Sequence, residues 1–242
     1  MSIVVTQSNY VPWRGWFAMA RSADTLVYLD DVQYTRRDWR NRNLIAGETG
    51  PKWITVPVSS KGHYKLKIHD VLCTSRDWCK SHLSILDSTY SGFEHYREIR
   101  EELRSTFNKV QSFATLSEVN HYVANWLFQV LEIGTEVHDS RSFPSTKQRS
   151  ERLVELCVAH GANRYISGPA ARAYLDENLF AERSIIIDWV DYGKLPPMPS
   201  NAFDSQEMSI LHVLAVFGRS EAIRLSTFSK PTESQNLSRE AE

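Results

Sequence analysis

Two short apolar runs with a helical pattern between them constrain the fold of this chain most strongly. Ile3–Thr6 and Thr25–Leu29 are rich in β-branched and aromatic residues and have the length of buried strands. Between them, apolar side chains recur at helical spacing, at Trp13, Trp16, Phe17 and Ala20. The sequence therefore predicts a βαβ unit over residues 3–31, with a very short crossover between two parallel strands.

Strand and helix patterns continue to alternate along the rest of the chain. A turn that contains Gly and Pro separates Asn43–Ile45 from Trp53–Val58, which predicts a β-hairpin. Further strands are expected at Lys65–Leu72, Glu136–Asp139 and Ser184–Val190, and residues 164–169 are expected to form a short strand that enters a tight turn. Helical patterns cover Asp77 to about Leu131, with Ser117 as a cap inside that segment, and then Lys147–His160, Ala170–Asp176 and Met208–Gly218.

This alternation predicts an α/β fold with a mainly parallel open sheet and flanking helices, of the Rossmann-like or nucleotidylyltransferase-like type. We expect a single α/β domain over residues 1–225, with a hairpin insertion at about 40–72 and a helical segment at about 76–132. Residues 226–242 contain few apolar side chains and are expected to form a disordered tail.

Composition excludes several classes of protein. The formal net charge is −1, so a general attraction to DNA or to a membrane surface is not indicated. No apolar run approaches the roughly 18 residues that span a bilayer, and the N-terminus lacks the basic region of a signal peptide. The three cysteines and eight histidines show no metal-ligand spacing. We therefore expect a cytoplasmic enzyme with reduced thiols, no bound metal and no membrane insertion.

Two adjacent carboxylates, Asp30 and Asp31, follow the second predicted strand directly. Ligands usually bind at the carboxyl ends of the strands in an open α/β sheet. Because successive residues of a strand point to opposite faces, at most one of the two carboxylates is expected to face a given pocket. That carboxylate would act as a general base or anchor a substrate amine. The alternative is a turn-starting aspartate that pairs with a nearby arginine.

A cationic and aromatic loop follows these carboxylates. Arg37, Arg40 and Arg42 suit the recognition of a diphosphate, and Tyr34 and Trp39 offer faces on which a base can stack. Asn41 and Asn43 add amide groups to the same stretch. The alternative is a solvated hairpin whose arginines pair with neighbouring aspartates.

Three other places carry candidate polar groups. Gln7, Asn9 and Tyr10 follow the first strand without the glycines of a dinucleotide or P-loop motif, and they suit hydrogen bonds to a sugar or a carboxamide. Ser167 and Gly168 form an anion-friendly turn before a helix, which is also an ordinary strand-to-helix turn. His82 lies on the mixed face of a helix and is a candidate acid or base, or else a structural histidine.

Several long stretches of this sequence resemble those of the WbqC-like protein family. The resemblance covers about residues 3–218. It is carried by residues 7–17 (Gln-Ser-Asn-Tyr-Val-Pro-Trp-Arg-Gly-Trp-Phe), 30–34, 39–43 and 53–58, by Trp78 with His82, and by residues 165–168, 174–175 and 208–211. The sequence departs from the expected pattern at Ser8, where a proline is expected, and at His212, where an acidic residue is expected after Ser-Ile-Leu.

The resemblance implies a role in bacterial surface polysaccharide synthesis, especially of the O-antigen of lipopolysaccharide. It implies an N-acyltransferase that moves glycine or another acyl group onto a nucleotide-activated amino sugar. Catalysis would fall to Asp31, His82 and Asp30, and Trp13 would join the substrate-binding residues named above. The acyl donor would be a carrier-protein thioester or an aminoacyl-tRNA, no cofactor is evident, and a homodimer is compatible with the pattern.

Two alternatives come from other functional classes. The strand, loop, helix and strand at the start are analogous to adenylate-forming nucleotidylyltransferase-like domains, which would make the protein an ATP-dependent ligase or nucleotidyltransferase-like enzyme. Those domains carry a His-x-x-His-type loop after the first strand, and residues 7–12 contain no histidine. The other alternative is a non-catalytic subunit that binds a nucleotide sugar.

Overall fold

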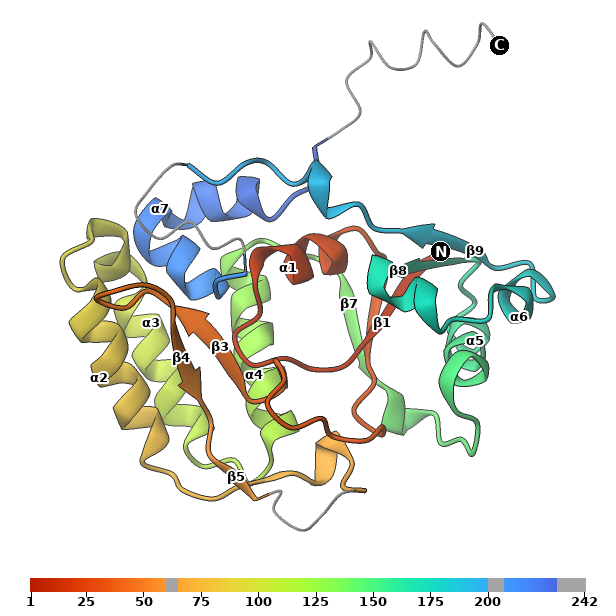
Figure 1. Ribbon diagram of the computed structural model, residues 1–242, viewed down its shortest axis with the longest axis horizontal. Coiled ribbons are helices and arrows are strands. Elements are labelled where there is room, and N and C mark those ends of the chain that lie inside the picture. The colour runs from red at the N-terminus through yellow and green to blue at the C-terminus, as the bar shows by residue number, and fades with distance from the viewer. Residues whose placement is uncertain (60–64, 200–206, 230–242) are drawn as a thin grey trace, which may run out of the picture.

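The computed structural model describes residues 1–59, 65–199 and 207–229, and its centre is a five-stranded parallel sheet. Its strands are β1 (Ser2–Thr6), β2 (Thr25–Tyr28), β7 (Glu136–Asp139), β8 (Arg164–Ser167) and β9 (Ile186–Trp189). They lie in the order β7-β2-β1-β8-β9, and every neighbouring pair is parallel (Figure 1). This confirms the prediction of an α/β fold with a Rossmann-like open sheet.

The strand order places a crevice beside β1. The chain moves outward from β1 to β2 and β7, and then crosses back to form β8 and β9 on the other side of β1. Loops that leave β1 and β8 therefore lead to opposite faces of the sheet. A gap opens between such loops at the carboxyl ends of the strands, and ligands of this fold class bind there.

Both faces of the sheet are covered, because the strand residues alternate between two hydrophobic clusters. Val4, Leu26 and Tyr28 pack against helices α1 (Arg14–Arg21), α4 (Leu116–Val130) and α7 (Ile210–Leu225). Ile3 and Val5 point the other way. Their side of the sheet is covered by helices α5 (Arg149–Ala159) and α6 (Glu177–Ala181).

The predicted hairpin and helical segment form the remaining part of the fold. Strands β3 (Arg42–Ile45) and β4 (Lys52–Thr55) pair in antiparallel fashion, as do the short strands β5 (Val58–Ser59) and β6 (Leu72–Cys73). Helices α2 (Trp78–Tyr90) and α3 (Glu94–Val110) complete the helical segment with α4 and lie on the side of the molecule away from α5 and α6 (Figure 1).

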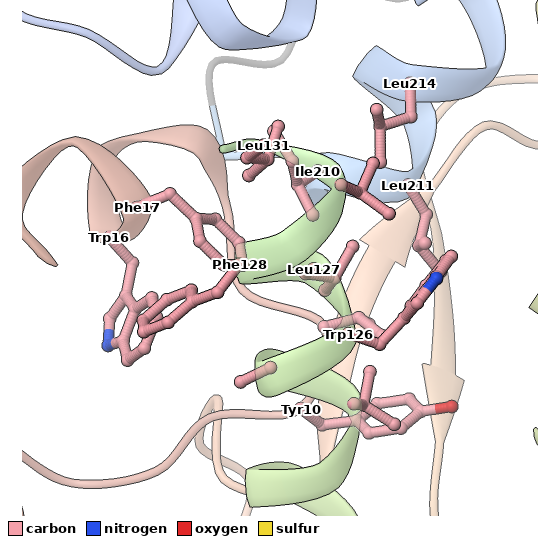
Figure 2. Close-up of a cluster of buried hydrophobic side chains, with 14 of the residues drawn as sticks. Tyr10, Trp16, Phe17, Trp126, Leu127, Phe128, Leu131, Ile210, Leu211 and Leu214 are labelled. Carbon is pink, nitrogen blue, oxygen red and sulfur yellow. The ribbon is translucent and has the colours of Figure 1, made fainter. Parts of the chain in front are cut away.

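Helix α7 closes this fold by packing on the loop that follows β1. The side chains of Ile210, Leu211 and Leu214 join aromatic residues of that loop, α1 and α4 in one buried cluster (Figure 2). The backbone N–H of Ile210 donates to the Pro12 carbonyl, and the buried guanidinium of Arg14 donates to the carbonyls of Pro196 and Leu225. The beginning and the end of the described chain are thus joined directly.

Two local predictions from the sequence are wrong. Residues 65–72 do not form one strand, because Ile68 and Val71 are buried three residues apart, as a 3-10 turn requires, and a 3-10 helix spans Ile68–Asp70. Ser117 does not cap α4. Thr115 does so in a capping box with Glu118, and the Ser117 hydroxyl serves a buried carboxylate instead.

The elements near the carboxyl end differ from the sequence prediction in their detail. Residues 170–176 were expected to be a helix, and a 3-10 helix at Pro169–Ala173 stands there, followed by α6. Within the expected tail, Ser226 is buried and the Ser229 N–H donates to the Lys194 carbonyl. Residues 230–242, the rest of that tail, lie outside the described residues.

Candidate functional site

A cleft of about 1160 Å³ opens at the carboxyl ends of β1, β2 and β8. Thr6, Gln7 and Asn9 line it after β1, and Ser167 and Gly168 line it after β8. Its other walls come from Trp13, Trp16 and Met19, from residues 145–149 at the start of α5, and from the loops at 39–40, 65–67 and 168–174. The cleft therefore occupies the crevice that the strand order predicts.

The charge of this cleft is strongly positive. Among the described residues that line it, six are cationic: Arg40, Lys65, Lys67, Lys147, Arg149 and Arg152. Asp31 is the one carboxylate in the same set of described residues. Because low-dielectric walls focus such a charge, the cleft favours an anionic ligand.

Asp31 projects into the cleft in a fixed orientation. Its Oδ1 accepts a 2.6 Å hydrogen bond from the Ser140 hydroxyl, and its Oδ2 accepts from Nη2 of Arg152 at 3.2 Å. Arg152 is 3% exposed and also pairs with Glu155 at 2.8 Å. A carboxylate has about four acceptor positions. Asp31, which is 18% exposed, thus retains acceptor positions for a ligand in the cleft.

Asp30 points to the other side of β2 and is fully buried. It accepts hydrogen bonds from the Ser8 backbone N–H, the Ser117 hydroxyl and Nε2 of His121. Burial raises the pKa of Asp30. The hydrogen bond and the charge of His121, together with hydrogen bonds from Ser117 and Ser8, outweigh burial, so the pKa of Asp30 lies below its usual value. The two neighbouring carboxylates lie on opposite faces, and Asp30 is part of the packing beneath the cleft.

The predicted arginine loop divides between the cleft and the surface. Nη1 of Arg40 donates to the Asn9 side chain and the Ser8 carbonyl, so Arg40 lies in the cleft beside the loop after β1. Arg42 stacks on the Trp53 ring at 4.1 Å and donates to the Arg37 carbonyl. Neither Arg37 nor Arg42 lies among the described cleft-lining residues. The structure therefore gathers one of the three predicted diphosphate-binding arginines into the site.

Four of the predicted substrate-binding residues hold the fold around the cleft. Tyr34 is buried, and its backbone pairs with Leu66. The Asn41 amide donates to the Val56 carbonyl, and the Asn43 amide donates to the carbonyls of Tyr10 and Val11. Tyr10 itself is buried and shapes the loop from below. Of the stacking residues, Trp39 lines the cleft and packs on Trp53 with ring centroids 5.2 Å apart.

His82 lies on α2, away from the described lining of the cleft. Its Nε2 donates to the Thr55 carbonyl at 3.2 Å, which leaves Nδ1 to accept from the Tyr10 hydroxyl at 2.8 Å. Burial lowers the pKa of His82 to about 4, against a smaller opposing effect of the Thr55 hydrogen bond. His82 is thus a neutral side chain that supports Tyr10 from beneath.

We expect this buried histidine to make the protein less stable in mild acid. Between pH 6.5 and about 4, His82 binds a proton in the unfolded chain and not in the folded protein. Its contribution to the free energy of unfolding should fall by about 3 kcal/mol over that range. Urea unfolding at several pH values should show a shallower decline for His82→Gln than for the natural protein. His95→Gln, which replaces a half-exposed histidine, is the control, and equal slopes for all three proteins would contradict the expectation.

Several cleft residues escaped the sequence analysis. Lys147 lies just before α5 and Arg149 begins it, and a basic pair at the start of a predicted helix was a readable signal. Lys65, Lys67 and Tyr174 reach the cleft from segments far away in the sequence, and no local pattern indicates their position.

Comparison with known proteins identifies the family of this chain. The sequence matches the WbqC-like protein family over residues 7–224. The chain belongs to the WbqC-like protein family. It is also similar to the uncharacterized protein Rv1507c of Mycobacterium tuberculosis, with 40% identity over 190 residues that cover 78% of this chain and 82% of that protein. No solved structure matches the sequence.

The family match encloses almost the whole site. The described cleft residues from Gln7 to Tyr192 lie inside the matched stretch. His212, which stands where the family pattern led us to expect an acidic residue, is buried in α7, and its Nδ1 shares a 3.1 Å hydrogen bond with the Tyr90 hydroxyl. It lies outside the described cleft lining. Among the helices that the structure describes, none is long and apolar enough to cross a bilayer.

Proposed function

We propose that this member of the WbqC-like family is an N-acyltransferase that acts on a nucleotide-activated amino sugar in bacterial surface polysaccharide synthesis. The observation that carries the proposal is a cationic cleft with a single carboxylate among its described lining, at the switch point of a Rossmann-like sheet. Cations suit the diphosphate of such a sugar, and the carboxylate suits its amine.

The diphosphate would bind at the start of α5. Lys147 and Arg149 line the cleft there, and neither forms an ion pair with a residue that the structure describes. The positive end of the helix dipole adds to their charge. Arg152, one turn further on, is already neutralised by Asp31 and Glu155, so it would position Asp31 and leave the phosphates to the two exposed cations.

The amine would lie against Asp31. In the proposed reaction, Asp31 accepts a proton from the sugar ammonium, and the neutral nitrogen then attacks the acyl carbonyl carbon. A carbon–nitrogen bond forms, and the bond from the acyl carbon to the donor's sulfur or oxygen breaks. The nitrogen loses a second proton as the amide forms, and the departing thiolate or alkoxide takes up that proton, so that an amide and a free donor result. An acyl carrier protein or an aminoacyl-tRNA would supply the acyl group.

A thermal-shift screen tests the nucleotide-binding step of this proposal. UDP- and dTDP-linked amino sugars should raise the melting temperature, because they bind the folded protein alone. In the Lys147→Ala/Arg149→Ala variant, the dissociation constant of UDP should rise at least about tenfold. Lys80→Ala/Lys109→Ala removes the same charge outside the described cleft and should leave it unchanged. If no nucleotide or nucleotide sugar stabilises the natural protein, the proposal is wrong.

A second candidate function rests on the strand order. A central β1 whose following loop lacks glycine fits an adenylate-forming ligase or nucleotidyltransferase-like enzyme as well. No histidine lies among the described cleft residues, so the usual catalytic group of those enzymes is missing there. Stabilisation by ATP alone would favour this function. Sugar-nucleotide binding without turnover on any donor would instead favour a non-catalytic subunit.

A further inference from the structure

The lining of the cleft is divided by charge. All of its described charged residues come from the end of β2, from residues 40, 65 and 67, and from the start of α5. The opposite side is built from residues 165–171 and Tyr174, in and after β8, and from Trp13, Trp16, Met19 and Tyr192, and none of these lining residues carries a charge. A ligand with a charged part and a flat, uncharged part would match both sides.

Tyr174 is the most exposed aromatic side chain on the uncharged side. It is 71% exposed, and its ring has no aromatic or cation–π partner among the described residues. Trp39, at the charged side, already packs on Trp53. The open ring face of Tyr174 is therefore free to accept a stacking partner, whereas that of Trp39 is partly covered.

The backbone fixes Tyr174 in place next to the start of α5. Its N–H and that of Leu175 both donate to the Ala171 carbonyl, and Leu175 is buried. The Asp176 N–H donates to the Ser150 hydroxyl at 2.9 Å, which joins this segment to the residue after Arg149. The exposed ring and the exposed cations are thus held at neighbouring positions of the cleft. Gly168, Pro169 and Ala170 line the same side of the cleft.

We propose that Tyr174 is the stacking wall of a nucleobase subsite, with Gly168, Pro169 and Ala170 as its floor. The inference rests on the proposed function and deepens it, because it sets the direction of the bound nucleotide. The base lies over the end of β8, the diphosphate lies at the start of α5, and the amino sugar points along the sheet toward Asp31. Aromatic stacking tolerates any base, so the subsite selects a nucleoside diphosphate over a bare diphosphate.

Calorimetric titration with UDP, dTDP and inorganic pyrophosphate tests this arrangement. Tyr174→Ala should weaken UDP binding about tenfold or more and leave pyrophosphate binding within twofold, since stacking contributes to the base alone. Tyr174→Phe keeps the ring and should bind UDP like the natural protein. Tyr122→Ala, which removes a 38% exposed aromatic residue of α4 outside the described cleft, is the matched control.

The possible outcomes separate the subsite from the function. UDP binding that is unchanged in Tyr174→Ala would overturn the subsite while the proposed function stands. A loss in Trp39→Ala with no loss in Tyr174→Ala would place the base at the charged side and overturn it too. Equal losses of UDP and pyrophosphate in Tyr174→Ala would show that the ring supports the cleft rather than the base. If the natural protein binds neither UDP nor dTDP, the subsite and the proposed function both fail.

Discussion

Replacing Asp31 by Asn should abolish any preference of the protein for an amino sugar over its hydroxyl counterpart. Asp31 is the one carboxylate among the described cleft residues, and it keeps free acceptor positions toward the ligand. A charged hydrogen bond to an ammonium group contributes about 1.5–3 kcal/mol, which corresponds to a preference of about tenfold to a hundredfold. Calorimetry with UDP-glucosamine and UDP-glucose measures the ratio of the two dissociation constants.

Asp191→Asn is the matched control for this experiment. Asp191 follows β9 at the same edge of the sheet, and its Oδ1 accepts from the Gly193 N–H, a role that asparagine also fills. It lies outside the described cleft lining, so the preference should persist in this variant. If Asp31→Asn keeps the preference for the amino sugar, Asp31 does not contact the substrate amine. The loss of UDP-glucose binding as well would mean that the substitution damages the cleft itself.

Replacing the neighbouring Asp30 by Asn should instead destabilise the whole protein. Asp30 is fully buried and accepts from three donors, one of which is His121. Leaving these buried donors without their charged acceptor costs about 3 kcal/mol. For a chain of this length, that loss corresponds to a fall of about 10 °C in melting temperature. Differential scanning calorimetry at pH 7 measures the fall.

The pH dependence of this loss identifies its cause. The pKa of Asp30 is lowered in the folded protein, so its ionised form stabilises the fold above about pH 4, the value in an unfolded chain. The difference between Asp30→Asn and the natural protein should therefore be complete at pH 7 and shrink as the pH falls below 4. Asp70→Asn, a substitution of a half-exposed carboxylate, should change the melting temperature little at any pH. A small and constant loss in Asp30→Asn would indicate a packing defect.

The sequence predicts the architecture well because its signals are local. Apolar runs define β1, β2 and β9, and a helical pattern that ends before Gly161 defines α5. The wrong strand at residues 65–72 has a tertiary cause. That segment is hydrogen-bonded to the loop after β2. The Ile68 N–H donates to the Val32 carbonyl, and the His69 N–H donates to the Asp30 carbonyl. Partners so far apart in the sequence leave no periodic trace.

Part of the candidate site is predictable because it directly follows a strand. Gln7, Asn9, Asp31 and Ser167 were expected in the site because the carboxyl ends of parallel strands meet at one edge, and all four line the cleft. Which polar residues of a loop turn inward is a different question. Asn43 and Tyr34 are residue types that often bind ligands. In this fold the Asn43 amide donates to the carbonyls of Tyr10 and Val11, and Tyr34 is buried. Residue type alone does not separate these two fates.

The contacts of Pro12 and Arg14 with α7 also limit how early this part of the protein can fold during synthesis. Arg14 donates to the carbonyl of Leu225, which follows it by 211 positions. At a translation rate of about 5–20 residues per second, Leu225 is synthesised roughly 10–40 seconds after Arg14. The wall of the cleft formed by α1 and the loop after β1 therefore cannot reach its final form before Leu225 has been synthesised. Just before that point, the growing chain already contains all five strands of the sheet, but the wall of the cleft lacks this contact.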